Sequence, residues 1–319
     1  MNITVIYNSS DSDEPSEQDT KKSAQEVAEA LGATLVAIRK QDAGDRSFFE
    51  KLHTDIVFNL IEWSGFDTKY ALQSIDIMED LKIPYTGSRH FGYEVHSDKI
   101  QMKKKFDELG IPTPRYQIYD KDFVTNNLNF PVIAKLTLEH CSIGLDESNV
   151  VFNTKDLGSK ILDLRSRYDM PILVEEFIDG EEVHVSVIDK DGSPWILPPD
   201  RIVFEESGKK SILGHDAKWE GGMMNSSWGN FDDYSDALKQ NIIKSSRDCY
   251  IGLGGRSYSR IDIRVKGEEY FILEINNNPG IDWDDDNALC HSSKKAGFAD
   301  FKSLLTHITN DALKHRISY

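Results

Sequence analysis

The stretch RIDIRVKGEEYFILEINNNPG, residues 260–280, decides the fold of this chain. Two runs in which apolar and polar residues alternate flank a Lys-Gly turn, so the stretch predicts two adjacent antiparallel strands. Side chains two apart along a strand lie on the same side of it, so the polar residues of each run share a face. These residues are Arg260 and Asp262 on the first strand and Glu274 and Asn276 on the second.

In-register pairing of the two strands would bring these four polar groups together. Two carboxylates and an amide oxygen are hard ligands of the kind that Mg²⁺ binds while it also keeps waters and substrate phosphates. The alternative is a hairpin whose polar face is only solvated. The stretch therefore predicts a magnesium site at Asp262, Glu274 and Asn276, with Arg260 beside it as a partner for an anion.

The composition is that of a folded globular protein with room for two or three domains. The chain has 319 residues, of which 39% are hydrophobic and 10% aromatic. Its net charge of -17 argues against a nucleic-acid partner, because no basic surplus is present to neutralise phosphates. No apolar run approaches the roughly 18 residues of a membrane-spanning helix, and the N-terminus has no signal-peptide pattern. Three cysteines without CxxC spacing favour a reducing compartment, so we expect a cytoplasmic protein with no membrane partner and no structural zinc.

The first ninety residues alternate strand-like and helix-like segments, which predicts a parallel sheet covered by helices. The polar segment 9–19 is predicted to be a loop, either a plain connection or a mobile lid. The expected strands span 3–7, 34–38 and 55–60, and the expected helices about 20–31 and 68–81.

The rest of the chain combines a small α+β block with a larger one, so we expect domains at 1–94, 95–182 and 183–319. A helix is predicted to begin at Ser97-Asp98 with Ser97 as its N-cap. Two strands, 171–178 and 182–188, are predicted to form a hairpin at Asp179-Gly180. The other expected elements are a strand over 131–136, helices over about 156–168, 234–253 and 299–314, and a long functional loop over 208–229.

Lys135 and the loop after it suit a phosphate. The lysine closes an apolar strand, so its stem can lie in apolar surroundings while its ammonium emerges at the strand end. The loop 139–144 offers small residues and backbone N–H groups, although it has no Walker sequence. Cys141 beside His140 could also be read as a nucleophile, but adjacent loop residues rarely form the hydrogen bond that this requires.

Two glutamates flank the Asp179-Gly180 turn at positions that suit a nucleotide. Glu175 could accept a hydrogen bond from an adenine amino group, and Glu182 could bridge the two hydroxyls of a ribose. A solvated strand edge explains the same residues equally well, so these two positions alone do not distinguish a nucleotide site from a solvated edge.

Short motifs follow one another in a fixed order from about residue 80 to the C-terminus. Each is weak alone, but their order and spacing are specific, and the series resembles the ATP-grasp superfamily and, within it, the D-alanine:D-alanine ligase family. The motifs are Tyr85-Thr86-Gly87-Ser88, Ser97-Asp98-Lys99, Val132-Ile133-Ala134-Lys135, Ser142-Ile143-Gly144, Val174 to Glu182, Ala217-Lys218-Trp219, Arg260-Ile261-Asp262 and Asn276 to Gly280.

The resemblance implies a role for each matching residue. Lys99 and Lys135 match lysines that hold the ATP phosphates, and Ser142 lies in the loop that covers them. Lys218 matches a lysine that reaches the terminal phosphate, and Arg260 with the Gly280 N–H matches an oxyanion-stabilising pair. The remaining matches are Glu175, Glu176 and Ile178 for adenine, Glu182 for ribose, and Asp262, Glu274 and Asn276 for two Mg²⁺ ions, which Mn²⁺ can replace.

The resemblance also implies a fold and a reaction. The fold is a three-domain ATP-grasp architecture, α/β and α+β in class, with the nucleotide between the central and C-terminal domains. The reaction joins a small-molecule carboxylate to an amine through an acyl phosphate and releases ADP and phosphate. A homodimer formed through the N-terminal region is the implied assembly.

The substrate end departs from the family pattern. The N-terminal glycine-rich turn with its glutamate is replaced by residues 8–11, and the His-Gly motif after the third strand by residues 59–63. His140 and Cys141 stand where the family has glycine and serine near the first substrate. After Gly280 the chain reads IDWDDD, in which Asp282, Trp283 and Asp284 could hold a cationic acceptor. The alternative is a solvated acidic loop.

These departures predict a carboxylate:amine ligase that joins an amino acid or related small carboxylate to an amine in specialised metabolism. A genuine D-alanine:D-alanine ligase is the first alternative. A catalytically silent ATP-binding regulatory module and a kinase with a stable phosphorylated product are the others. Retention of Arg260 together with the three metal-ligand positions speaks against the silent module, because a pure binder has little need of an oxyanion partner.

Overall fold

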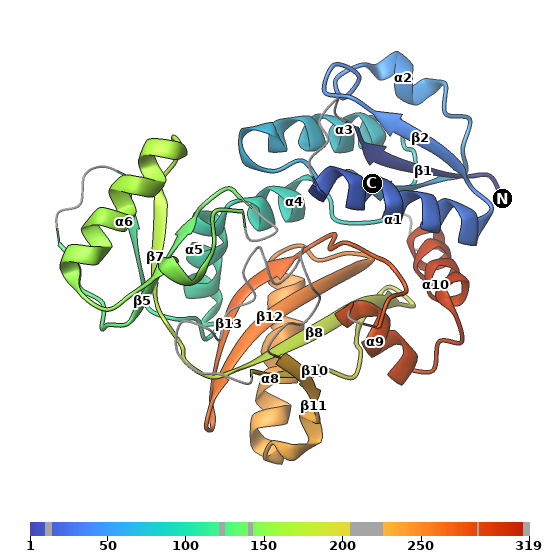
Figure 1. The fold of residues 1–319 in the computed structure, drawn as a ribbon. Helices are drawn as coiled ribbons and strands as arrows, with labels where there is room; N and C mark the ends of the chain where they lie inside the picture. Colours follow the sequence, from blue (N-terminus) through green and yellow to red (C-terminus); the bar gives the residue numbers. More distant parts are fainter. Residues whose placement is uncertain (10–14, 121–124, 140–142, 205–225, 286, 315–319) are drawn as a thin grey trace.

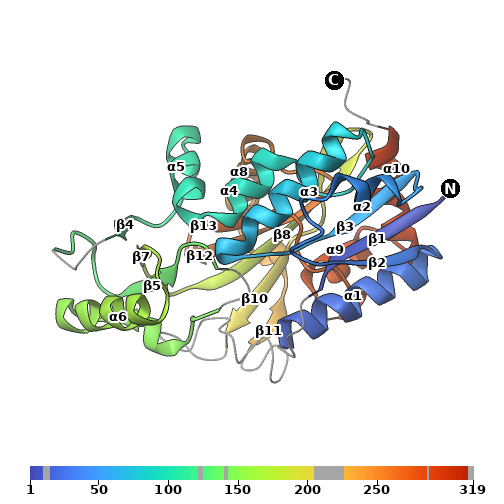
Figure 2. The ribbon, with the colours of Figure 1, turned by 90° about the horizontal axis from the view of Figure 1, so that it is seen from above.

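The computed structural model describes residues 1–9, 15–120, 125–139, 143–204, 226–285 and 287–314. Within these ranges the strands form three sheets that follow one another along the molecule (Figures 1 and 2). The sheet of the small central block lies at one end, the largest sheet in the middle and the N-terminal sheet at the other end. None of the helices in the described ranges is long and apolar enough to cross a membrane.

The N-terminal sheet is parallel and has the order β2-β1-β3, as the alternation of elements predicts. The first helix, α1, begins at Pro15 and thus includes part of the segment 9–19 that we predicted to be a loop. Proline is favoured at the first position of a helix, where its missing N–H costs nothing. The bounds are β1 Ile3–Asn8, α1 Pro15–Leu31, β2 Thr34–Ile38, α2 Arg46–Glu50, β3 Ile56–Leu60, α3 Thr68–Asp80 and α4 His90–Ser97.

Helix α5, Lys99–Leu109, connects the N-terminal block to the central sheet. Its N-cap is Asp98, whose carboxylate accepts from the backbone N–H groups of Ile100 and Gln101, so the predicted Ser97 cap is wrong. Ser97 instead closes α4, because the chain turns at Asp98. Gly110 ends α5 with a φ of 65°, the left-handed conformation in which glycine is favoured.

The central sheet is antiparallel with the order β4-β7-β5-β6, and helix α6 packs against it. The predicted hairpin at Asp179-Gly180 does not form, because β7 and the next strand, β8, belong to different sheets. A Cβ at Gly180 would lie 2.1 Å from the Val265 carbonyl oxygen, so the chain passes between the sheets too closely for a side chain. The bounds are β4 Tyr116–Tyr119, β5 Val132–Leu136, β6 Val150–Val151, α6 Thr154–Arg167 and β7 Ile172–Glu176.

The largest sheet runs β11-β10-β8-β12-β13, with β9 paired to β8. Most of the loop predicted over 208–229 lies outside the described residues, but its last four residues form strand β11 rather than loop. The bounds are β8 Glu181–Lys190, β9 Ser193–Ile196, β10 Asp200–Phe204, β11 Ser226–Gly229, α8 Asp236–Gly252, β12 Tyr258–Lys266, β13 Glu269–Asn276, α9 Ala288–Lys295 and α10 Phe301–Lys314.

Two apolar clusters cover the largest sheet. One packs α5 and α8 against alternating residues of β8 and β12 and against Ile272 and Ile275 of β13. The other joins the sheet to the N-terminal block through α10, which packs against both α1 and β8. The N-terminal sheet is therefore fixed relative to the largest sheet by a shared core.

Gly92 and Gly254 bring α4 against the turn that follows α8. A Cβ at Gly92 would lie 2.3 Å from the Gly254 carbonyl oxygen, so the two backbones touch. Asn277 strengthens this junction, because its buried side-chain amide donates to the carbonyls of Gly92 and Leu253 at 3.2 and 3.0 Å. The junction thus ties the N-terminal block to the end of β13.

We expect Gly92→Ala to destabilise the protein by about 2 kcal/mol. Alanine is the better helix former by up to about 1 kcal/mol, but the clash with a backbone carbonyl outweighs that gain. The measurement is the denaturation midpoint, with Gly44→Ala as the control, because the nearest atom to a Cβ at Gly44 is 3.6 Å away. Equal stability of the two variants would show that α4 can shift away from the turn without loss.

Candidate active site

Strands β12 and β13 pair in the register that brings the predicted polar groups together. Arg260 lies opposite Asn276, and Asp262 lies opposite Glu274. The Arg260 guanidinium binds both carboxylate oxygens of Asp262, with Nε–Oδ1 at 2.7 Å and Nη2–Oδ2 at 3.0 Å. Burial disfavours the charged guanidinium, but Asp262 and then Glu274 outweigh burial and raise the pKa of Arg260. Arg260 is thus a fixed positive charge beside two carboxylates.

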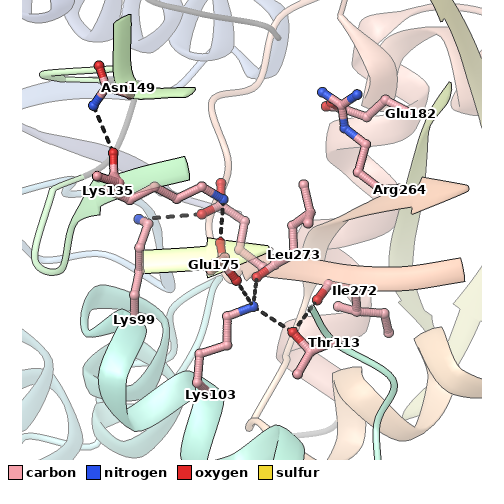
Figure 3. Close-up of polar contacts among 12 residues, drawn as sticks. Lys99, Lys103, Thr113, Lys135, Asn149, Glu175, Glu182, Arg264, Ile272 and Leu273 are labelled. Atoms are coloured by element: carbon pink, nitrogen blue, oxygen red, sulfur yellow. Dashed lines mark hydrogen bonds and ion pairs between the residues drawn. The ribbon is translucent and has the colours of Figure 1, made fainter. Parts of the chain in front are cut away.

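Three lysines, two from α5 and one from β5, point towards this hairpin (Figure 3). Lys99 lies 3.4 Å from Glu274 and donates to the Glu139 carbonyl at 2.7 Å. Lys135 and Lys103 contact the two oxygens of Glu175 at 2.6 and 2.5 Å. The structure therefore places both predicted phosphate lysines at the site, each paired with a carboxylate.

Sequence reasoning missed Lys103, which is buried at the centre of this group. The signal was present, because Lys99 and Lys103 are four residues apart and so share one face of α5. Burial works against the charge of Glu175, but Lys103 and then Lys135 outweigh burial and lower its pKa to about 2. Glu175 is consequently a buried carboxylate that stays ionised between two ammonium groups.

Glu182 lies in a second ion-pair group on the same sheet. Its carboxylate contacts Arg264 at 2.9 Å and His184 at 2.8 Å, and His184 lies 3.8 Å from Asp262. Pairing of β8 with β12 places His184 opposite Asp262 and Arg264 opposite Glu182. Sequence reasoning missed both His184 and Arg264, although each lies two residues from a predicted site residue.

The two predicted backbone contacts follow Glu175 at the passage between the sheets. The Glu176 carboxylate faces Arg115 and Asn129, at 3.0 and 2.9 Å, and its N–H donates to the Arg115 carbonyl. Ile178 is half-buried in the segment that crosses to β8. Glu176 is thus the last residue of β7, and Ile178 follows it in the segment between the central and largest sheets.

A small cavity of about 30 Å³ lies between α1, the end of β3 and the turn after β13. This volume is enough for about one water molecule. Its lining includes Gly280, the predicted oxyanion donor, and the carboxylates of Asp19 and Glu62. Burial raises the pKa of Asp19. Two acidic residues, Asp19 and Glu62, therefore lie near the turn that follows the β12–β13 hairpin. Neither was among the site residues predicted from the sequence.

The side chains of the predicted acidic loop contact other residues of the protein. Asp282 accepts from the Asp284 backbone N–H and from the Asn287 amide, both at 2.9 Å. Asp284 lies 3.7 Å from Lys22. Trp283 stacks on Phe301 with ring centroids 5.9 Å apart, and the Lys294 ammonium lies 5.0 Å above its ring. Trp283 thus packs against the protein core, not against the cavity, so it is poorly placed to cover an acceptor.

Four of the predicted site residues, His140, Cys141, Ser142 and Lys218, lie outside the described residues.

The donor set suits Mg²⁺. Asp262 lies opposite Glu274 and accepts from the Asn276 amide at 3.3 Å, and the three residues together can offer two carboxylates and an amide oxygen. Among the described residues no group of three or more His, Cys, Asp or Glu side chains is placed to hold a metal. Mg²⁺ is commonly held by one or two carboxylates and completes its shell with water and phosphate oxygens.

The sequence of this chain is similar to those of known ligases. The family model described as D-ala D-ala ligase C-terminus matches residues 106–310. A D-alanine–D-alanine ligase of Carboxydothermus hydrogenoformans is 32% identical over 254 residues, covering 74% of this chain and 76% of the relative. One of Stutzerimonas stutzeri is 28% identical and covers 92% and 89% of the two chains.

The fold gives the same result. A crystal structure of D-alanine–D-alanine ligase from Bacillus anthracis complexed with ATP matches with a TM-score of 0.75 at 23% identity, covering 99% of this chain and 98% of that one. The fold is therefore the mixed α/β ATP-grasp fold of carbon–nitrogen ligases. The chain belongs to the D-alanine–D-alanine ligase family.

We expect Glu175→Gln to destabilise the protein at neutral pH by about 3 kcal/mol, because two buried ammonium groups lose their partner. The pKa of Glu175 is lowered from 4.5 to about 2, so its stabilisation is complete above pH 4.5 and disappears as the pH falls towards 2. The difference in unfolding free energy between wild type and variant should shrink over that range, as measured by urea denaturation.

Glu176→Gln is the matched control for this measurement. Its partly exposed ion pair with Arg115 is worth at most about 1 kcal/mol. A Glu175→Gln difference that stayed constant from pH 7 to pH 2 would contradict the assignment of the ionised state.

Proposed function

We propose that the protein is an ATP-dependent ligase that joins two amino acids through an acyl phosphate, with D-alanine expected in both positions. The observation that carries the proposal is the register of β12 and β13, which places Arg260 and two carboxylates on one face with Lys99 beside them. The names of the relatives support the choice of D-alanine. We predict a cytoplasmic enzyme whose substrates are small molecules.

ATP is proposed to lie between the central and largest sheets. Glu175 would accept from the adenine amino group and Glu182 from the ribose hydroxyls. Lys99 and Lys135 would bind the phosphates, since their side chains are 11% and 15% exposed and therefore accessible to a ligand. When bound at Asp262, Glu274 and Asn276, two Mg²⁺ ions would supply positive charge between the phosphates and align the transfer.

In the first step, one oxygen of the substrate carboxylate attacks the γ-phosphorus of ATP. The bond between that phosphorus and the bridging oxygen breaks, and ADP leaves. Lys99 and Lys135, which pair with Glu274 and Glu175 in this structure, would become partners of the phosphates, which carry more negative charge. The product of this step is an acyl phosphate.

In the second step, the neutral amine of the other amino acid attacks the acyl carbon. The tetrahedral intermediate carries an oxyanion, which Arg260 and the Gly280 N–H would stabilise. Collapse of the intermediate forms the amide, expels phosphate and releases the proton of the attacking amine. The Arg260 guanidinium binds Asp262 in this structure, and it would be available for this role if Asp262 held a metal ion instead.

Two acidic residues beside Gly280 support an amino-acid substrate. The N-terminal glutamate of the family is missing here, and this absence favoured a different carboxylate in our sequence analysis. Asp19 and Glu62 line the cavity and would provide the missing partner for a substrate ammonium. The packing of Trp283 against Phe301 removes one argument for a special cationic acceptor.

The first experiment measures ADP release from ATP and Mg²⁺ with D-alanine, L-alanine and pooled amino acids, with mass spectrometry of the products. A product equal to two D-alanines minus water supports the proposal. Arg260→Ala should lower the turnover number by about 10² to 10³-fold. Product formation only from other carboxylates or amines would replace D-alanine, and ATP binding without turnover on any mixture would overturn the ligase.

We further expect Asp19→Asn and Glu62→Gln to raise the KM for the first amino acid by about tenfold or more, because each removes a charged partner of its ammonium. The KM for ATP should stay unchanged, since neither residue is among those proposed to contact the nucleotide. Steady-state kinetics with each substrate varied provide the test, and Glu29→Gln, an exposed carboxylate on α1, is the control. An equal rise in both KM values would argue against an ammonium site.

A further inference from the structure

Lys103 differs from the other two lysines of the site in its access to a ligand. Its side chain is 1% exposed, whereas those of Lys99 and Lys135 are 11% and 15% exposed. Its ammonium lies 2.5 Å from Glu175 Oε1, 2.6 Å from Thr113 Oγ1 and 3.0 Å from the Leu273 carbonyl oxygen (Figure 3). The ammonium thus donates two hydrogen bonds, to Thr113 and to Leu273, and forms an ion pair with Glu175.

The partners of Lys103 are themselves fixed. Thr113 donates its hydroxyl proton to the Ile272 carbonyl at 2.8 Å, so its oxygen is turned to accept from Lys103. Leu273 lies in β13 of the largest sheet, and Glu175 lies in β7 of the central sheet. Lys103 therefore connects α5, the catalytic hairpin and the central sheet at one atom.

Glu175 has one buried partner and one partner near the surface. Lys103 holds Oε1, and Lys135 contacts Oε2 at 2.6 Å from the end of β5. Removal of Lys135 from Oε2 exposes an acceptor oxygen, whereas removal of Lys103 would break contacts in three elements. The exchangeable partner is thus Lys135, and the permanent partner is Lys103.

We propose that Lys103 is a positioning residue for the nucleotide base: it keeps Glu175 charged and oriented while Lys135 leaves Oε2 for the phosphates of ATP. This inference rests on the proposed function, because it requires ATP to bind between these sheets. The freed Oε2 accepts from the 6-amino group of adenine. The arrangement couples the two ends of the nucleotide, since a phosphate that attracts Lys135 also releases the acceptor for the base.

The charge balance explains why a second lysine is needed. A buried carboxylate without a cation takes up a proton, because its ionised form is poorly solvated. A protonated Glu175 would donate to a 6-oxo purine as readily as it would accept from a 6-amino purine. Lys103 therefore sets the preference for adenine over hypoxanthine after Lys135 has moved.

The test compares the affinities of ATP and ITP, each with Mg²⁺, by titration calorimetry. Wild type should bind ATP more tightly. Lys103→Met should weaken ATP about 10- to 100-fold and ITP much less, because a hydrogen bond to a charged group is lost only with adenine. Lys104→Met, the same change one residue along at an exposed position, should leave both affinities unchanged.

A Lys103→Met Glu175→Gln double variant separates positioning from folding. It removes both members of the Lys103–Glu175 ion pair, so neither charge of that pair is left buried without its partner. Its ATP:ITP ratio should equal that of Glu175→Gln alone if Lys103 acts through Glu175. An equal loss of both nucleotides in Lys103→Met, or a further fall of the ratio in the double variant, would overturn the inference.

The outcomes also separate this inference from the proposed function. A wild type that binds neither nucleotide would overturn both. A wild type that prefers ATP, with an unchanged ratio in Lys103→Met, would overturn the role of Lys103 and leave the ligase proposal standing.

Discussion

The antiparallel pairing of β13 with β12, and of β12 with β8, is the constraint on which the site depends. Paired strands place opposite side chains about 4.5–5.5 Å apart, and every second residue of a strand lies on the same face. The register joins Asp262 to both Glu274 and His184, and Arg264 to Glu182. A shift of one residue would move all these groups into the apolar layer that α5 and α8 cover. The same register therefore defines the hydrophobic core and the charged face.

The charged face contains its own counterions. Glu175 holds Lys103 and Lys135, Glu274 holds Lys99, and Asp262 holds Arg260. Buried charges without partners would be costly, so these pairs stabilise a site with several buried charges in a chain whose net charge is -17. They are also compatible with binding of a triphosphate, because a ligand would replace the carboxylate partners of Lys99 and Lys135 with phosphate oxygens of the same sign.

The parts of the fold that follow from local patterns were predicted well. The parallel N-terminal sheet and the β12–β13 hairpin follow from alternation and turn residues, and both are confirmed. The Asp179-Gly180 hairpin was wrong, because a strand–turn–strand pattern does not say whether the two strands share a sheet. Lys103 was missed for a related reason: a lysine on an amphipathic helix is usually solvated, and only the packing of β7 and β13 around α5 buries this one.

The sequence by itself determined the residues of the catalytic hairpin, the face on which each lies, and the family to which the motifs are similar. These features depend on spacing along the chain, which the periodicity of a strand converts directly into geometry. Only the tertiary structure decided which residues of distant segments meet. Lys103 pairs with Glu175, and Asp19 and Glu62 line one cavity with Gly280. Such contacts join residues from about 70 to more than 250 positions apart, and their formation depends on how whole sheets pack rather than on any local pattern.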